Sequence, residues 1–317
     1  MLVVGCFFSG YLGAQGSKEQ SPRYKNPIVF CRAHLDENGK TIRQSKLWVM
    51  EEDGSGLRQL TFGSHYDDHP SFYADQEHVL FSEFAGETLS RDTEAKLIKL
   101  NIYTGDRETV LEQAGRALHH ATISPLGDDL IVYAKDTAKR HSEWFRLPPK
   151  AYELNTRASN GVAVSGDSVV FMHEKNSGYS PREVSIARIY GHGPGANVSI
   201  LTDDESLHRR PAVSPDGKWL AWQSNAEGGD DEILLAPIDA ATKPRNLTQI
   251  PGNDGHPWFS RDGKWIVFES DRTAKGLDRN GCDGRRGCEI WKVNIETGKQ
   301  TQLTFGGATF VANRPRM

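Results

Sequence analysis

The sequence predicts an all-β protein, and within that class a six-bladed β-propeller with four strands in each blade. Three observations lead to this prediction: a repeat that recurs along the chain, glycine-containing turns inside the copies, and one copy that is divided between the two ends of the chain. The 31 glycines and 15 prolines agree with many short strands joined by tight turns.

The repeat consists of a short strand, a turn that often contains Asp-Gly, and a second strand of two apolar residues followed by an aromatic residue. Its clearest copies are residues 211–222 (PAVSPDGKWLAW) and 257–268 (PWFSRDGKWIVF). Weaker copies end at Phe81, Tyr133 and Phe171, so the aromatic residues recur at intervals of about 40 to 50 residues. This period is typical of propeller blades, and the aromatic residues are expected to pack between neighbouring blades.

The sixth copy is divided between the termini. Phe30 ends a second strand that has no first strand before it, and residues 313–317 (NRPRM) correspond to the start of the repeat. Pairing of the N-terminal strands with the C-terminal strand would close the ring of six blades and protect its sheet edges. The sequence therefore predicts one propeller over residues 26–317, preceded by a leader and linker over residues 1–25.

Each copy is expected to contain four strands. In the fifth copy they are predicted at 256–260, 265–269, 288–293 and 300–304. The glycine of the Asp-Gly turn tolerates the positive φ that tight hairpins need. The fourth strand often ends in Leu-Thr, at Leu60-Thr61, Leu201-Thr202, Leu247-Thr248 and Leu303-Thr304.

The start of the chain predicts export. Residues 2–14 are apolar or small, and no charge occurs before Lys18. This run is too short to span a bilayer as a helix but is typical of a secretory signal, which predicts a periplasmic or secreted protein without a transmembrane span in its mature form. The alternative is a lipoprotein, because residues 3–6 (VVGC) are similar to a lipobox that would place a lipid on Cys6.

Residues 214–218 (SPDGK) and 260–264 (SRDGK), each followed by a strand and later by Leu-Thr, resemble the WD40-like repeats of the TolB propeller family. The resemblance covers almost everything after residue 26. It implies a propeller fold, which occurs in the periplasmic TolB protein, in propeller domains of prolyl oligopeptidase-like enzymes and in oligogalacturonate lyases. It therefore implies the fold more strongly than the function.

Alignment of the copies places one residue of each blade at the start of its first strand, around one end of the central channel. These six aligned residues are His69, His120, Ser159, Arg210, His256 and Arg314. Three interpretations remain open. The histidines could hydrogen-bond neighbouring blades, the histidines and arginines together could attract an anionic ligand, or His69, His120 and His256 could bind a divalent metal.

The long connection from Asp271 to Cys288 contains two cysteines. A disulfide between Cys282 and Cys288 is predicted, because an exported chain meets an oxidising compartment. The alternation of Asp and Asn before Gly281 is similar to a calcium loop, but Cys282 occupies a ligand position and the distal glutamate is misplaced.

Charge and missing motifs exclude several function classes. The formal net charge is −4 and the basic residues are scattered, which argues against nucleic acid as a partner. No Gly-x-Ser-x-Gly nucleophile motif, phosphate-binding loop or dinucleotide fingerprint occurs. The sequence favours a non-catalytic exported propeller that needs no cofactor and binds a protein or cell-envelope component through its loop face and the channel end.

The alternative function is a metal-dependent lyase that acts on an anionic saccharide, similar to oligogalacturonate lyases. In that scheme the three aligned histidines would hold the metal. Arg210 and Arg314 would pair with carboxylates of the substrate.

Overall fold

The computed structural model describes residues 23–35, 42–87, 93–125, 130–136, 142–147, 158–163, 168–174, 184–190, 197–202, 204–239, 244–273, 288–306 and 310–317. The predicted leader, Cys6 and Cys282 lie outside these residues. Within the described part of the chain all regular elements are β-strands, and they form five sheets.

The first sheet has the order β23-β1-β2-β3, with β1 at Pro27–Leu35, β2 at Ile42–Glu51, β3 at Arg58–Gln59 and β23 at Phe310–Arg316. The second sheet has seven strands: β4 (Tyr66–Phe72), β5 (His78–Phe84), β6 (Ala95–Asn101), β7 (Arg107–Leu111), β8 (Arg116–Ile123), β9 (Leu130–Asp136) and β10 (Ser142–Leu147). The third contains β11 (Ala158–Ala163), β12 (Ser168–Glu174), β13 (Val184–Tyr190) and β14 (Asn197–Ile200). The fourth contains β15 (His208–Val213), β16 (Trp219–Ser224), β17 (Glu232–Pro237) and β18 (Arg245–Asn246). The fifth contains β19 (Asp254–Phe259), β20 (Trp265–Ser270), β21 (Glu289–Asn294) and β22 (Gln300–Gln302).

The number of blades corrects the sequence prediction. A closed ring of six four-stranded blades was expected, and this is wrong: the described residues form five blades, one of which has seven strands. A parallel bridge between Ala95 in β6 and Ala117 in β8 joins two copies of the repeat into this one sheet. Only the short link 112–115 separates β7 from β8, so the start of β8 is held beside the start of β6.

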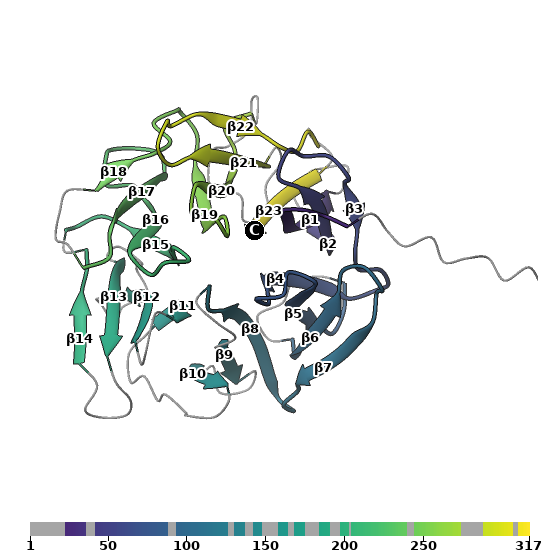
Figure 1. Cartoon of the computed structure of the whole chain (residues 1–317). Helices are drawn as coiled ribbons and strands as arrows, with labels where there is room; N and C mark the ends of the chain where they lie inside the picture. The colour runs from purple at the N-terminus through teal and green to yellow at the C-terminus, as the bar shows by residue number, and fades with distance from the viewer. Residues whose placement is uncertain are drawn as a thin grey trace, which may run out of the picture.

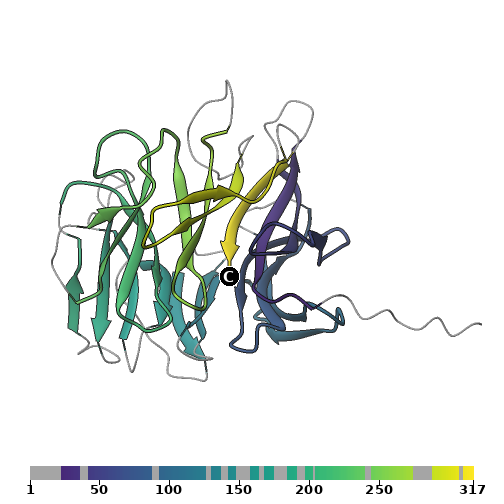
Figure 2. The ribbon, with the colours of Figure 1, turned by 45° about the horizontal axis from the view of Figure 1, so that its top comes forward.

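The sheets are arranged around a common centre, and the first strand of each repeat copy lies nearest to it. These inner strands are β4, β8, β11, β15, β19 and β23 (Figure 1). The last strand, β23, runs antiparallel to β1, and Figure 2 shows the two side by side. Within this pair, Val29 lies opposite Arg316 and Cys31 lies opposite Asn313.

The Asp-Gly turns are stabilised by the same hydrogen bonds in two blades. Ser214 Oγ donates to Asp216 Oδ1 at 2.6 Å and accepts from the N–H of Trp219 at 2.9 Å. Ser260, Asp262 and Trp265 repeat both bonds at 2.6 and 2.9 Å. The glycines that follow have φ values of 70° and 68°, which only glycine adopts at little cost.

The Leu-Thr pairs also have a structural role. The hydroxyl of each threonine accepts a hydrogen bond from a backbone N–H in the third strand of its own blade. The pairs are Thr61 with Leu47, Thr202 with Ile186, Thr248 with Ile233 and Thr304 with Ile290, at 2.8 to 3.0 Å. These residues are therefore explained by blade structure, since each one satisfies a buried donor.

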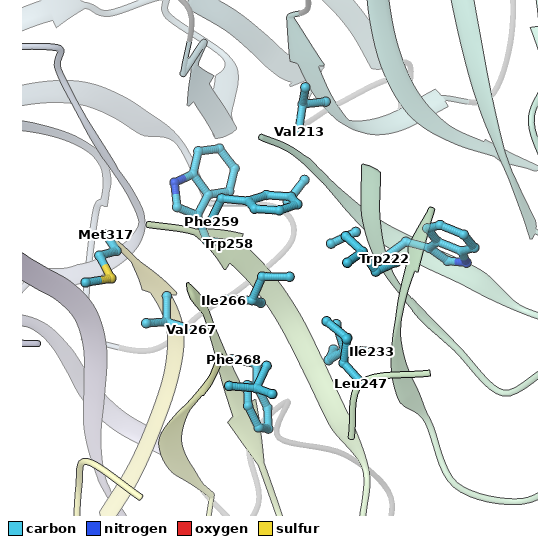
Figure 3. Packing of buried hydrophobic residues seen from close by; sticks show 14 of the residues in the cluster. Val213, Trp222, Ile233, Leu247, Trp258, Phe259, Ile266, Val267, Phe268 and Met317 are labelled. Atoms are coloured by element: carbon cyan, nitrogen blue, oxygen red, sulfur yellow. The ribbon is translucent and has the colours of Figure 1, made fainter. Parts of the chain in front are cut away.

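The core lies between the blades, as Figure 3 shows for the fourth and fifth sheets. The aromatic residues of the repeat occupy it: Phe30, Phe81, Phe171, Trp222 and Phe268 are all at most 3% exposed. The side chain of Tyr133 lies outside the described side chains.

Residues 23–25, predicted as the end of the linker, contact the propeller. The hydroxyl of Tyr24 donates to the carbonyl of Gly56 at 2.7 Å, and the N–H of Lys25 donates to Glu51 Oε1 at 2.7 Å. Arg23 forms an ion pair with Glu77 at 2.5 Å. The domain boundary itself stays a prediction.

Candidate ligand-binding site in the central pocket

Five of the six aligned residues share an unusual backbone conformation. Their φ values are 51° for His69, 51° for His120, 53° for Arg210, 48° for His256 and 52° for Arg314. Residues other than glycine rarely adopt positive φ, which costs on the order of 1 kcal/mol or more. The shared conformation indicates that these five positions are structurally equivalent.

A β-bulge accounts for this conformation. Strand register shifts between Asp68 and Ser71, between His119 and Thr122, between Arg209 and Ala212, and between Gly255 and Trp258. An aligned residue lies inside each of these shifts, and Arg314 lies inside the corresponding shift between β23 and β1. A bulge interrupts the alternation of side chains along a strand and redirects the residue within it.

In β11 the equivalent position is one residue further along the chain than predicted. The register with β12 shifts between Ser159 and Val162, so Asn160 occupies the place that His69 has in β4. Ser159 corresponds to Asp68 in this register. Its side chain, like that of Asn160, lies outside the described side chains.

The strain at these positions predicts that a glycine variant is more stable than an alanine variant, the reverse of the usual order in a strand. Replacing His120 by glycine is expected to leave the protein about 1 kcal/mol more stable than replacing it by alanine, because only glycine adopts positive φ freely. Urea unfolding of both variants measures the difference. The same two substitutions at Thr122, which lacks positive φ, provide the control, and there alanine should be the more stable. Equal stability of the two His120 variants would contradict the strain.

Four of the six aligned residues, His69, His120, Arg210 and His256, line one pocket. Its wall is completed by Ala121, Thr122, Pro211, Pro257, Trp258 and Arg316. The volume open to the centre of a water-sized sphere is about 20 Å³, which is room for one or two water molecules or one small polar group.

Arg316 replaces Arg314 in the pocket wall. The Arg314 guanidinium instead lies against Asp68, with Nη1 2.9 Å from Oδ1, and both side chains are buried. Asp68 Oδ1 also accepts a hydrogen bond from Cys31 Sγ at 3.4 Å. Burial and the nearby Asp68 charge raise the pKa of the Cys31 thiol well above its usual value, so the thiol stays protonated.

The histidines of β4 and β8 are in contact. The ring centroids of His69 and His120 are 3.8 Å apart, and that of His119 is 4.6 Å from His120. Burial lowers the pKa of His69 well below 6.5, and the Arg314 charge lowers it further. The pKa of His120 is lowered in the same direction by burial and by the adjacent His69. Both imidazoles are therefore neutral at pH 7.

Two carboxylates contact histidines from behind the pocket wall. Glu269 Oε1 is 2.7 Å from His256 Nδ1, and Asp68 Oδ2 is 3.1 Å from His69 Nδ1. The other oxygen of Glu269 accepts the backbone N–H of Arg314 at 2.7 Å. The contact between Glu269 and His256 is a hydrogen bond, which fixes the orientation of the His256 ring. The side chains of Asp68 and His69 are close but form no hydrogen bond with each other.

The described residues contain no group of three or more His, Cys, Asp or Glu side chains that could hold a metal ion. The metal site predicted at His69, His120 and His256 stays a prediction from the sequence. The predicted disulfide stays a prediction, because Cys282 lies outside the described residues, while Cys288 is completely buried.

Among the residues that the structure describes, no helix has the length and hydrophobicity needed to cross a membrane. No family model matches the chain.

A protein TolB homolog from Chlorobium chlorochromatii is 30% identical over 158 residues, which cover 35% of this chain and 36% of that protein. The match thus spans only about a third of this relative. TolB from Acinetobacter baumannii superimposes with a TM-score of 0.63 at 16% identity, covering 94% of this chain and 68% of that one. A putative TolB from Agrobacterium tumefaciens gives a TM-score of 0.62 at 17% identity, covering 92% and 98%. At these identities the structural likeness establishes the fold alone.

Proposed function

We propose that this chain, a β-propeller of the TolB type, is a non-catalytic protein of the periplasm that binds a protein or another component of the cell envelope at its central pocket. The observation that carries the proposal is the recurrence of one strained bulge in five inner strands. Four of these bulges direct His69, His120, Arg210 and His256 toward one pocket.

Backbone strain repeated at one site supports a binding role. Each positive-φ residue lowers the stability of the fold, and such residues concentrate at sites where a side chain must point in a particular direction. Core packing alone would not require charged or polar residues at these positions. Arg210 and Arg316 would offer guanidiniums to an anionic ligand in the pocket.

The proposed non-catalytic role rests on the residue types of the pocket. Histidines and arginines line it, and within the described residues no serine, cysteine or carboxylate does. The metal-dependent lyase remains a prediction from the sequence alone. Its metal would have to be held beside Arg210 and Arg316, whose positive charges oppose the binding of a divalent cation.

The proposal is tested by affinity capture from a bacterial envelope fraction with the purified chain as bait. The wild type is expected to enrich a defined envelope component, and Arg210→Gln is expected to recover at least about tenfold less of it. Arg261→Gln removes the same charge from the exposed turn between β19 and β20 and serves as the matched control. Absence of any enrichment by the wild type contradicts the binding function, and equal recovery by Arg210→Gln contradicts the pocket as its site.

A further inference from the structure

The charge of the central pocket is the starting observation. Arg210 and Arg316 line it, and none of its described lining residues is acidic. Behind the wall, Asp68 is already engaged by Arg314, and Glu269 by His256 and the Arg314 backbone. Two guanidiniums, those of Arg210 and Arg316, therefore line the pocket, whereas no carboxylate is among its described lining residues.

The surroundings of the pocket shift the pKa of the Arg316 guanidinium. Burial lowers its pKa from 12.5 to about 10. The neighbouring Cys31 and Glu269 oppose this shift, and the weaker effects of the Arg210 and Arg314 charges add to it. The guanidinium still carries its charge at neutral pH. One terminal nitrogen, Nη1, donates to the carbonyl of Pro315 at 2.8 Å, whereas the buried Nε has no hydrogen-bond acceptor among the described residues.

Packing holds Arg316 in place. Its guanidinium lies over the ring of Trp258, 4.5 Å from the centroid, and Trp258 also lines the pocket. A guanidinium stacked in this way is pre-organised, so less conformational entropy is lost when it binds an oxyanion.

The size of the pocket limits what can enter it. The centre of a water-sized sphere can move within a volume of about 20 Å³ in this pocket. That is enough room for a planar carboxylate on a narrow stem. Pockets that enclose whole drug-sized ligands are much larger, roughly 300 Å³ or more. A pyranose ring would remain outside, and the slender acidic side chains of a protein are the better fit.

We propose that the pocket binds the carboxylate of an aspartate or glutamate side chain from a partner protein, with Arg210 and Arg316 as its cationic contacts. Guanidinium–carboxylate hydrogen bonds are among the strongest that side chains form. The inference rests on the proposed function, because it names the chemical group by which the envelope partner would be recognised.

The experiment is a nuclear magnetic resonance titration of the peptide acetyl-Gly-Glu-Gly-amide, labelled with ¹³C at the side-chain carboxyl. The wild-type chain is expected to give a saturable shift of the carboxyl signal. The shift should weaken at least about tenfold in affinity for Arg210→Gln and for Arg316→Gln, since each loses a charge-assisted hydrogen bond. Arg261→Gln should bind the peptide as the wild type does. Circular dichroism of each variant confirms that it is folded.

Three competing ligands give the outcomes that would overturn the proposal. The matched peptide acetyl-Gly-Gln-Gly-amide has nearly the same shape without the charge, and equal affinity for it would exclude recognition of a carboxylate. Tighter binding of galacturonate than of the glutamate peptide would assign the pocket to saccharides. Tighter binding of inorganic phosphate would assign it to phosphate groups. An unchanged affinity in both pocket variants would place the peptide elsewhere.

Failure of the carboxylate inference can be distinguished from failure of the proposed envelope function. If the wild type captures an envelope component but does not bind the glutamate peptide, only the carboxylate inference is wrong. If it binds the peptide but captures nothing from the envelope, the pocket chemistry is right and the envelope function is wrong.

Discussion

Replacing Arg272 by methionine is expected to lower the free energy of unfolding by about 3 to 5 kcal/mol at pH 8 and by clearly less at pH 5. Arg272 Nη2 lies 2.5 Å from Asp254 Oδ2, and both side chains are buried. The arginine also donates to Ser270 Oγ at 2.8 Å. Removing it leaves a buried carboxylate without its counter-charge.

The pH dependence follows from the pKa of Asp254. Burial raises this pKa from 3.8 to about 7, although the Arg272 charge opposes the shift. A carboxyl with a raised folded-state pKa binds its proton more tightly in the folded protein, so its contribution to stability falls as the pH rises from about 4 to about 7. Without Arg272 the pKa rises further, and the destabilisation continues to grow above pH 7. Protonation at pH 5 removes most of this electrostatic cost.

Urea unfolding of the Arg272→Met variant at the two pH values measures the effect. The double variant Arg272→Met, Asp254→Asn is the control, because an asparagine does not titrate and the pH-dependent part of the loss should disappear. A loss of equal size at pH 5 and pH 8 in the single variant would show that Arg272 acts through packing alone. Its contacts with the rings of Phe268 and Trp291 make that the natural alternative.

Replacing Phe268 by alanine is expected to cost about 3 to 5 kcal/mol of unfolding free energy. Phe268 lies in β20, the second strand of the fifth blade, and is completely buried in the cluster drawn in Figure 3. Its loss removes apolar contacts and leaves a cavity between the blades. Phe268→Leu keeps most of the volume and should cost less than about 1.5 kcal/mol.

The matched control is Phe305→Ala in the same blade. This phenylalanine follows β22 and is 78% exposed, so its removal should change stability by at most about 0.5 kcal/mol. Thermal or urea unfolding of the three variants gives the comparison. Similar losses for Phe268→Ala and Phe305→Ala would refute the assignment of the repeat aromatics to the inter-blade core.

Local features of the fold were predictable because each depends on a few adjacent residues. The strands predicted for the fifth copy at 256–260, 265–269, 288–293 and 300–304 correspond closely to β19, β20, β21 and β22. The turn at 260–264 contains its own hydrogen-bond partners, so its sequence is sufficient to recognise it. The number of blades was not predictable in the same way, since the bridge between Ala95 and Ala117 joins residues of different copies.

The candidate site was predictable in part. Alignment found His69, His120, Arg210 and His256 because the bulge recurs at the same place in each copy. It placed Arg314 in the pocket instead of Arg316, and it selected Ser159 instead of Asn160. Both differences arise at the bulge, where the alternation of side chains along the strand is interrupted. There the alternating sequence pattern no longer indicates on which face of the strand a side chain lies.

The sequence by itself determined the strand and turn repeat, the buried aromatic residue of each well-described copy, and the positions at which polar residues begin the inner strands. These are consequences of short-range chemistry: turn glycines, local hydrogen bonds and alternation along a strand. Only the tertiary structure decided that two copies share one sheet, that Arg314 is neutralised by Asp68, and that Arg316 faces the pocket. These outcomes depend on contacts between residues far apart in the chain, whose energies no single repeat contains.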